Sequence, residues 1–523
     1  MVVLRRKEFG SKLILFQLVY IVLCALLGDY LSLPYAASYV IDLINIAVFI
    51  WLLIYIRTLD DIYRLRLQYV LYAVLLLLAV AWMTALLNAV SPMLVLWATR
   101  NALRYFPFFF AIIVFWDKKS ADIFSKALML LQLPNLLMGL IQFFIEDLRG
   151  DYLGGIFGKE QGCNAYLVIF LLVVVTLVVE RYLHGKANVV EMAFSCLSCM
   201  ILAAMAELKI LYIMVPLIIA VSLAMNKVSV KTFFLALLIS IVLVIAVNLI
   251  VVYFPSRKDS FSSLKALLSV GKETTGGYYI PRLGAFSTIN EYFFHGSPVR
   301  NLIGYGFGSC EFSRSGFLTS DFYIKHGALN YHWFSHQMWF LQTGFLGILC
   351  YAIFILSVFF WITRMKLRFG DPNGIGSFGQ IMCGVVVLNF FYNLSLRSES
   401  GYLMFAALAL PIVYYKEIIF SRQNSGRQEA AIPEEATIFV KPAIPEEAPI
   451  FEEVPISEEV PISEEAPIFV KSAIPEEAAI PEEAPIFAKP AASPAKPQEK
   501  AEPSSFCFRP EERTEPEESL GSQ

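Results

Sequence analysis

The sequence predicts an all-α polytopic membrane protein with about 12 transmembrane helices, one long outer loop and a disordered C-terminal tail. Of its 523 residues, 57% are hydrophobic, and the mean hydropathy is +0.63. Apolar runs of about 20 residues recur, which is the length that crosses roughly 30 Å of hydrocarbon. The net charge of −3 hides two unlike parts, with 9 basic and 22 acidic residues from Arg422 to the end and 32 basic and 22 acidic residues before it.

The N-terminal segment is basic and leads into an apolar run without a small-residue cleavage site, so we expect an uncleaved first span. The predicted spans are residues 12–29, 35–56, 68–90, 94–116, 122–145, 164–183, 188–206, 209–226, 232–254, 336–363, 377–396 and 400–420. Together they form a membrane domain over residues 1–420, which the tail, residues 421–523, follows.

Lysine and arginine gather at the N-terminus and in alternate connections between the spans, while the intervening short connections are poor in both. These clusters are Arg5, Arg6, Lys7 and Lys12; Arg57, Arg64 and Arg66; Lys118 and Lys119; Arg181 and Lys186; Lys227 and Lys231; and Arg364, Lys366 and Arg368. By the positive-inside rule both termini are cytoplasmic. The long loop, about residues 255–335, therefore faces outward.

The tail contains near-repeats such as "AIPEEATIFVKP" and "AIPEEAPIFAKP". This composition is typical of an extended, disordered segment with some polyproline II. Two interpretations stay open: a dispensable repeat expansion, or isolated Ile-Phe pairs that dock a partner.

Arg100 and Arg104 lie four residues apart in the outer half of the span 94–116, so they share one helix face. Each charge costs about 2.5–3.5 kcal/mol in the hydrocarbon, and the two also repel each other. An anion between them or a water-filled cavity would relieve both costs. The alternative is that the side chains snorkel to the outer interface.

Three further cations are predicted at the outer face. Lys209 begins the span 209–226, where the helix dipole disfavours a cation, and either a bound anion or Glu207 would relieve this. Arg282 lies among aromatic residues of the outer loop, and this combination suits phosphates and sugar rings. Arg397 lies between the last two spans.

His336 opens the span 336–363 within the stretch "NYHWFSHQMWFLQTGFLGIL". A helix N-terminus favours the neutral imidazole, which is able to accept a proton. The alternative is an interfacial histidine with a satisfied hydrogen bond. In the loop, "GYGFG" lacks the Lys-Ser/Thr pair of a P-loop, so we predict a tight turn there.

Almost no carboxylate is expected to accompany these cations in the membrane. That pattern argues against a proton-coupled transporter, which needs intramembrane acids, and against a magnesium-dependent nucleotide-sugar enzyme, which needs a carboxylate metal site. It suits a dianionic substrate held at the outer leaflet. We therefore expect no cofactor and no metal site.

Four stretches resemble the O-antigen ligase and O-antigen polymerase superfamily of bacterial envelope glycosyltransferases, over roughly residues 90–400. "GLIQFF" followed by "GGIFGKEQGCNAYLVIFLL" is similar to the Gly-x-Phe-Gly…Asn sequence of the family and matches Asn164. "AELKILYIMVPL" lies where members show Ser-Arg, with Lys209 in place of the arginine. "PRLGAF…LIGYGFGSC" resembles the loop arginine and its Gly-rich turn. "SHQMWFLQTGFLGIL" resembles the His-Asn-x-x-Leu…Gly-x-x-Gly motif, with Gln337 in place of the asparagine.

The resemblance implies a fold of the membrane glycosyltransferase type, a polyprenyl-diphosphate-linked oligosaccharide donor and a metal-independent, inverting displacement at the anomeric carbon. We combine the motifs with the outer cations to select candidate site residues: His336 and Arg282 for catalysis; Arg100, Arg104 and Lys209 for the diphosphate; and Asn164, Gln337 and Arg397 for the acceptor or glycan. The active site would face outward from the bacterial cytoplasmic membrane and act in O-antigen or exopolysaccharide assembly.

The implied partners are the lipid-linked donor, a glycan or lipid-core acceptor and other envelope polysaccharide assembly proteins, with no nucleic acid. Polymerase and ligase use the same donor, and the sequence does not separate them. The alternative from another class is a transporter or binding protein for a glycolipid or polysaccharide, which would move its substrate without forming a glycosidic bond.

Overall fold

A computed structural model describes residues 2–55, 58–226, 280–282, 284–313 and 316–430, with a few isolated residues between 232 and 240. These residues form helices and turns, and no strand occurs among them, so the all-α prediction is confirmed. Almost all of the predicted span 232–254, the first part of the predicted outer loop and the tail beyond residue 430 lie outside the described residues.

The helices before the outer loop are α1 (Val2–Leu31), α2 (Tyr39–Ile54), α3 (Thr58–Arg64), α4 (Gln68–Leu87), α5 (Pro92–Leu103), α6 (Tyr105–Phe115), α7 (Lys118–Phe144), α8 (Asn164–Leu183), α9 (Val189–Met205) and α10 (Leu211–Met225). Those in and after it are α14 (Ala285–Ile289), α15 (Pro298–Ile303), α16 (Asp321–His326), α17 (Ser335–Phe369), α18 (Ile375–Tyr392) and α19 (Ser400–Ala430). Single helical turns lie at η1 (Tyr35–Ser38), η2 (Gly150–Tyr152), η3 (Gly155–Phe157), η5 (Asn290–Phe294), η6 (Gly316–Leu318), η7 (Gly327–Leu329), η8 (Tyr331–Trp333) and η9 (Pro372–Gly374).

Eight helices among the described residues are long and apolar enough to cross a membrane, which confirms a multi-pass membrane protein by helix length and hydropathy. They are α1, α2, α4, α7, α8, α17, α18 and α19, and each overlaps one of the twelve predicted spans. α9 and α10 coincide with two more predicted spans but have only 17 and 15 residues.

The predicted span 94–116 forms two helices, α5 and α6, because the helical hydrogen-bond pattern is interrupted at Arg104, whose own backbone stays helical (φ −60°, ψ −19°). Pro107 explains the break, since it has no N–H to donate to the Leu103 carbonyl and its ring crowds that carbonyl. Every residue of α6 except Pro107 is buried, and the helix packs against α1, α2 and α19. Arg104 therefore lies at a helix break inside the protein.

α17 is kinked at Gly344, whose backbone has φ 61° and ψ −159°. The kink turns the carbonyls of Leu341 and Gln342 out of the helix, where they accept the N–H groups of Tyr305 (2.8 Å) and Gly306 (2.9 Å). The "GYGFG" stretch thus docks as a tight turn against the broken helix, which confirms the turn predicted there.

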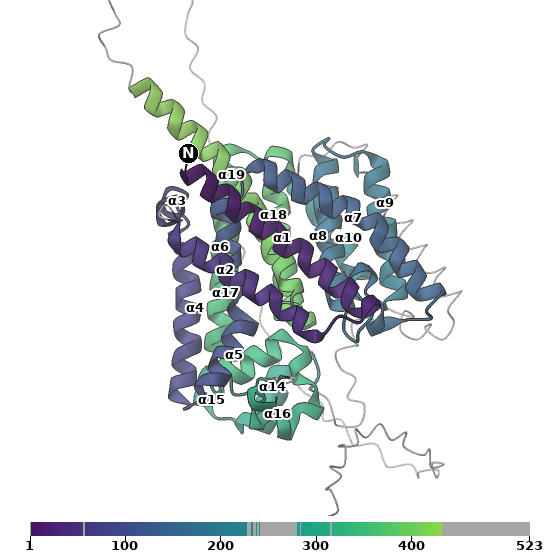
Figure 1. Ribbon diagram of the computed structural model, residues 1–523, viewed down its shortest axis with the longest axis vertical. Coiled ribbons are helices and arrows are strands. Elements are labelled where there is room, and N and C mark those ends of the chain that lie inside the picture. The colour runs from purple at the N-terminus through teal and green to yellow at the C-terminus, as the bar shows by residue number, and fades with distance from the viewer. Residues whose placement is uncertain are drawn as a thin grey trace, which may run out of the picture. The chain divides into compact units, whose positions relative to one another are not determined.

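The described part of the outer loop folds into the short helices α14, α15 and α16. A small core that includes Ile289, Phe294 and Phe340 joins them to the start of α17. Figure 1 shows these helices at one end of the membrane domain, and the N-terminus and the end of α19 at the other. The loop helices and the N-terminus thus lie at opposite ends of the membrane domain, and the outward position of the loop stays a prediction.

Gly344→Ala is expected to destabilise the protein, because a side chain disfavours this backbone conformation by more than about 1 kcal/mol. The added Cβ would also lie 2.4 Å from the backbone of Leu302. Thermal unfolding of the purified protein in detergent measures the effect. Gly384→Ala is the matched control, since nothing lies within 4 Å of its added Cβ. Equal unfolding temperatures for the two variants would contradict the structural role of the kink.

Candidate functional site at the outer ends of the helices

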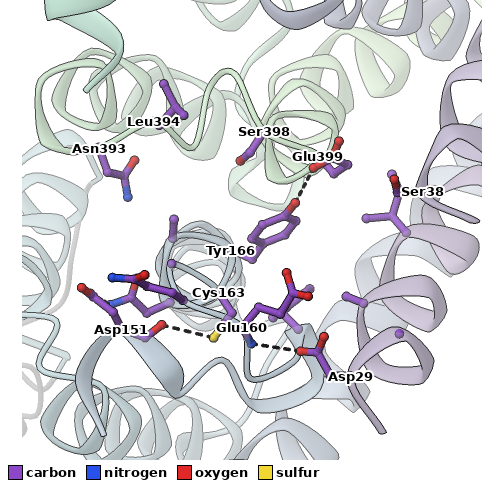
Figure 2. Close-up of a pocket in the computed structure, with 18 of the residues that line it drawn as sticks. Asp29, Ser38, Asp151, Glu160, Cys163, Tyr166, Asn393, Leu394, Ser398 and Glu399 are labelled. Carbon is purple, nitrogen blue, oxygen red and sulfur yellow. Dashed lines mark hydrogen bonds between the residues drawn. The ribbon is translucent and has the colours of Figure 1, made fainter. Parts of the chain in front are cut away.

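A cavity of about 710 Å³ lies at the ends of the helices that are predicted to face outward. Its walls come from α1, the connection to α2, the segment 151–166 that leads into α8, Leu208, Arg282, Trp333 and Phe334, and the residues between α18 and α19. Figure 2 shows several of these side chains converging from different segments. Segments far apart in the sequence thus form one recess.

The described lining of this cavity combines one arginine with four carboxylates. The Arg282 guanidinium lies over the rings of Phe334 (4.8 Å) and Tyr392 (5.0 Å), and no ion pair to it occurs within the described part of the chain. The carboxylates belong to Asp29, Asp151, Glu160 and Glu399. Arg282 is therefore placed to bind an anionic group that enters the cavity.

Polar residues of α7 hold the wall segment that precedes α8. The buried Gln142 accepts the Gly155 N–H at 2.7 Å, and the buried Asn135 accepts the Ile156 N–H at 3.1 Å. Across the cavity, the carboxylate of Asp29 accepts the Glu160 N–H at 3.1 Å (Figure 2). The bonds to Gly155 and Ile156 satisfy backbone groups that burial would otherwise leave unpaired.

Asn164, the first residue of α8, lines the cavity and donates to the Asp151 carboxylate at 2.8 Å. The structure therefore brings this residue, predicted to bind the acceptor or glycan, to the same recess as Arg282. The hydrogen bond also fixes the position of Asp151 on the wall.

Arg100 and Arg104 are paired with carboxylates of the protein. Arg104 donates to Asp42 and to Glu399, each at 2.9 Å, and Arg100 donates to Asp42 at 2.5 Å. The expectation that almost no carboxylate accompanies the membrane cations is therefore wrong. The two arginines do share an anion, but the protein itself supplies it from α2 and from the connection before α19.

Glu399 joins this charge network to the cavity. It lines the recess and accepts the Tyr166 hydroxyl at 2.5 Å, as Figure 2 shows. Burial raises the pKa of the Glu399 carboxyl, but Arg104, the Tyr166 hydroxyl and Arg100 outweigh this and lower the pKa to about 2. Glu399 is thus a negative charge with a fixed position. Its ion pairs with Arg100 and Arg104 hold it there, and neither arginine lines the cavity.

Arg397 is buried and forms an ion pair with the buried Glu311. The Glu311 carboxylate also accepts the amides of Gln342 (2.8 Å) and Asn101 (2.9 Å). The cluster ties the outer loop to α5, α17 and the connection before α19. Arg397 does not line the cavity, although it was predicted to bind acceptor or glycan.

Gln337 and Lys209 also lie outside the cavity lining. The Gln337 amide donates to the Ile280 carbonyl at 3.2 Å, two residues before Arg282. Gln337 thus positions the segment that carries Arg282. Lys209 follows the lining residue Leu208 and precedes α10.

His336 is 1% exposed and does not line the cavity. Its ring packs near those of Phe391 (5.2 Å), Phe286 (5.9 Å) and Phe334 (6.0 Å). The sequence places this histidine at the start of a membrane helix, but α14, which carries Phe286, packs over that position. Any effect of His336 on a reaction in the cavity would therefore act through the packing of its neighbours.

The sequence interpretation missed several residues of the site. The position of Asp42 could have been predicted to matter, because it is the one acidic residue of the predicted span 35–56. Its charge is opposite to that of the two arginines in the span 94–116. Nothing in the sequence singled out Asp29, Asp151, Tyr166 and Glu399, since each lies near the end of a predicted span or in a connection between spans, where polar residues are ordinary.

Among the described residues, no group of three or more His, Cys, Asp or Glu side chains is placed to hold a metal ion. No family model and no curated protein sequence matches the chain.

Asp42→Asn should destabilise the protein by about 3 kcal/mol, because it leaves Arg104 with one carboxylate in a buried site. Unfolding in detergent monitored by intrinsic fluorescence measures this. Glu8→Gln is the matched control, since it removes a charge from the exposed pair of Glu8 and Lys12 and should change stability by less than about 1 kcal/mol. An Asp42→Asn variant as stable as the wild type would return Arg100 and Arg104 to the group of candidate ligand-binding cations.

Proposed function

We propose that the protein is an inverting glycosyltransferase of the O-antigen ligase and polymerase type. It transfers or polymerises a polyprenyl-diphosphate-linked glycan at the outer face of the bacterial cytoplasmic membrane. The observation that carries the proposal is Arg282, which lies on the wall of a cavity of about 710 Å³ without an ion pair among the described residues. The motif resemblance around Arg282, "GYGFG" and His336 supports the same proposal.

In this proposal Arg282 stabilises the charge that develops on the departing lipid diphosphate. Phe334 and Tyr392 restrict the guanidinium to a narrow range of positions, so little reorganisation is needed when the charge appears. The aromatic lining also offers apolar faces to sugar rings. Arg100 and Arg104 hold Glu399 in place and do not contact the diphosphate.

The acceptor hydroxyl needs a group that accepts its proton, and the lining carboxylates differ in their fitness for this role. Asp29 already accepts backbone N–H groups, and Glu399 neutralises buried arginines. Asp151 and Glu160 are exposed at the recess. We assign the proton acceptor to this pair, with Asp151 favoured because Asn164 fixes its carboxylate.

A glycolipid transporter is the second candidate, and one observation favours it. The break at Arg104, with its carboxylate partners from other segments, is the kind of discontinuous, charged helix on which transporter sites are built. The predicted scarcity of intramembrane acids therefore no longer argues against this class. Formation of a glycosidic bond separates the two candidates.

The first test is product analysis after the purified protein is mixed with a defined polyprenyl-diphosphate oligosaccharide, with and without EDTA. A ladder of longer glycans on the polyprenyl lipid identifies a polymerase, and transfer only after envelope lipids are added identifies a ligase. Arg282→Ala should lower the turnover about 100-fold or more, in EDTA as well. Arg149→Ala should not, since this arginine is exposed and pairs with Asp147 outside the cavity.

Three results would contradict the proposal. Movement of the substrate across the membrane without a new glycosidic bond, with and without added envelope lipids, would favour the transporter. Equal losses in the two arginine variants would show that general outer charge matters rather than Arg282. Full activity of Arg282→Ala would exclude its role at the diphosphate.

Asp151→Asn should lower the turnover about 100-fold, while the Michaelis constant for the donor changes little, because proton removal from the acceptor occurs in the chemical step. Glu160→Gln is the parallel variant, and a larger loss there would transfer the role to Glu160. Retention of full activity in both variants would exclude general-base catalysis by this pair. The pH dependence of turnover should show one acidic limb that the decisive substitution removes.

A further inference from the structure

Four arginines converge on a second cavity, of about 260 Å³, at the predicted cytoplasmic ends of the helices. We call it the arginine pocket; its lining is Arg64, Arg66, Arg368, Arg422, Leu65, Met365, Phe369, Ile419 and Gln423. The arginines come from the turn between α3 and α4, the end of α17 and the end of α19. In Figure 1, α3 and the end of α19 lie close to the N-terminus, away from the helices of the outer loop.

Aromatic rings and an amide hold three of the four guanidinium groups of the pocket, those of Arg64, Arg368 and Arg422. Arg422 and Arg368 lie over the Phe369 ring at 4.9 and 5.1 Å. Arg64 lies over the Phe420 ring at 4.3 Å and donates to the Gln423 side-chain oxygen at 3.0 Å.

Within the described residues, none of the four arginines of the pocket has an ion pair, and the pocket lining contains no carboxylate. Four like charges around one recess repel one another, and an anion within the recess would relieve that repulsion. Forked guanidinium groups bind phosphate oxygens in pairs, which makes a phosphate group the best-suited anion.

The pocket lies at the membrane boundary. Six of its nine residues fall in the last turns of the candidate spans Ser335–Phe369 and Ser400–Gln423, and the other three lie between the end of α3 and the start of α4. Leu65, Met365 and Ile419 add an apolar floor to the ring of cations. The turn that carries Arg64 and Arg66 is fixed there, because Trp361 donates its indole N–H to the Leu65 carbonyl at 2.8 Å.

We propose that the arginine pocket binds the phosphate group of an anionic lipid of the cytoplasmic leaflet. The apolar floor and the position at the ends of two spans favour a lipid headgroup over a free phosphate ion, which would gain nothing from either. Basic pockets between membrane helices on this side bind phosphorylated headgroups by the same combination of features. The volume is below the about 300–1,000 Å³ of ordinary small-molecule sites, which suits a headgroup rather than an oligosaccharide.

The test uses the full-length protein in nanodiscs made from equal amounts of phosphatidic acid and phosphatidylcholine. Native mass spectrometry of the released protein measures which lipid it retains. The wild type should retain phosphatidic acid preferentially. In the Arg368→Gln/Arg422→Gln variant the ratio of retained phosphatidic acid to phosphatidylcholine should be about tenfold lower. The Lys118→Gln/Lys119→Gln variant removes the same charge from exposed residues that begin α7 outside the pocket, and it should keep the preference.

Added inorganic phosphate distinguishes the two sources of the phosphate group. At millimolar concentration it should displace little lipid, and full displacement would assign the pocket to a soluble phosphate and overturn the lipid. Equal losses in both double variants would show general surface attraction and overturn the site. The wild type could also show no lipid preference, while the tail beyond residue 430 becomes more sensitive to protease only in the arginine variant. That result would assign the pocket to the acidic tail instead. Absent preference without that change also overturns the proposal.

Discussion

A charge inside a membrane protein has to be neutralised, and the ion pairs of Arg104 are the interaction on which the rest of this structure depends. Arg104 is nearly buried and binds one carboxylate from α2 and one from the connection before α19. Both ion pairs form together only when three separate parts of the chain meet between α5 and α6. The desolvation cost of the charges is high in such a place, so a loss of either partner leaves an uncompensated charge.

This network also explains how the outer cavity gains a fixed geometry. Glu399 is held by Arg104 on one side and by Tyr166 on the other, and both Glu399 and Tyr166 face the recess. The opposite wall is held by amide side chains of α7 that satisfy backbone groups before α8. Polar residues inside the spans thus work as supports, and the cavity keeps only a few groups for ligand chemistry.

The two ends of the membrane domain use arginine differently. At the end that is predicted to face outward, most of the described arginines have carboxylate partners, and Arg282 in the cavity lining is an exception. At the end that is predicted to face the cytoplasm, Arg64, Arg368 and Arg422 of the arginine pocket lie over aromatic rings, and the four pocket arginines lack carboxylate partners among the described residues. A paired arginine contributes to the fold, whereas an unpaired one near an opening retains its capacity to bind an anion.

The sequence by itself determined the membrane class and the positions of most long helices, because hydrocarbon thickness acts through local composition. The orientation stays a prediction from the distribution of lysine and arginine. It also identified Arg282 and Asn164, which do line the cavity, and the tight turn at "GYGFG". Only the tertiary structure decided the rest. His336 is buried where α14 packs over it, and Arg100, Arg104 and Arg397 have ion-pair partners because Asp42, Glu399 and Glu311 come from distant segments. Whether a charge binds a ligand or a neighbour depends on which side chains meet in space, and a linear pattern of residues does not contain that information.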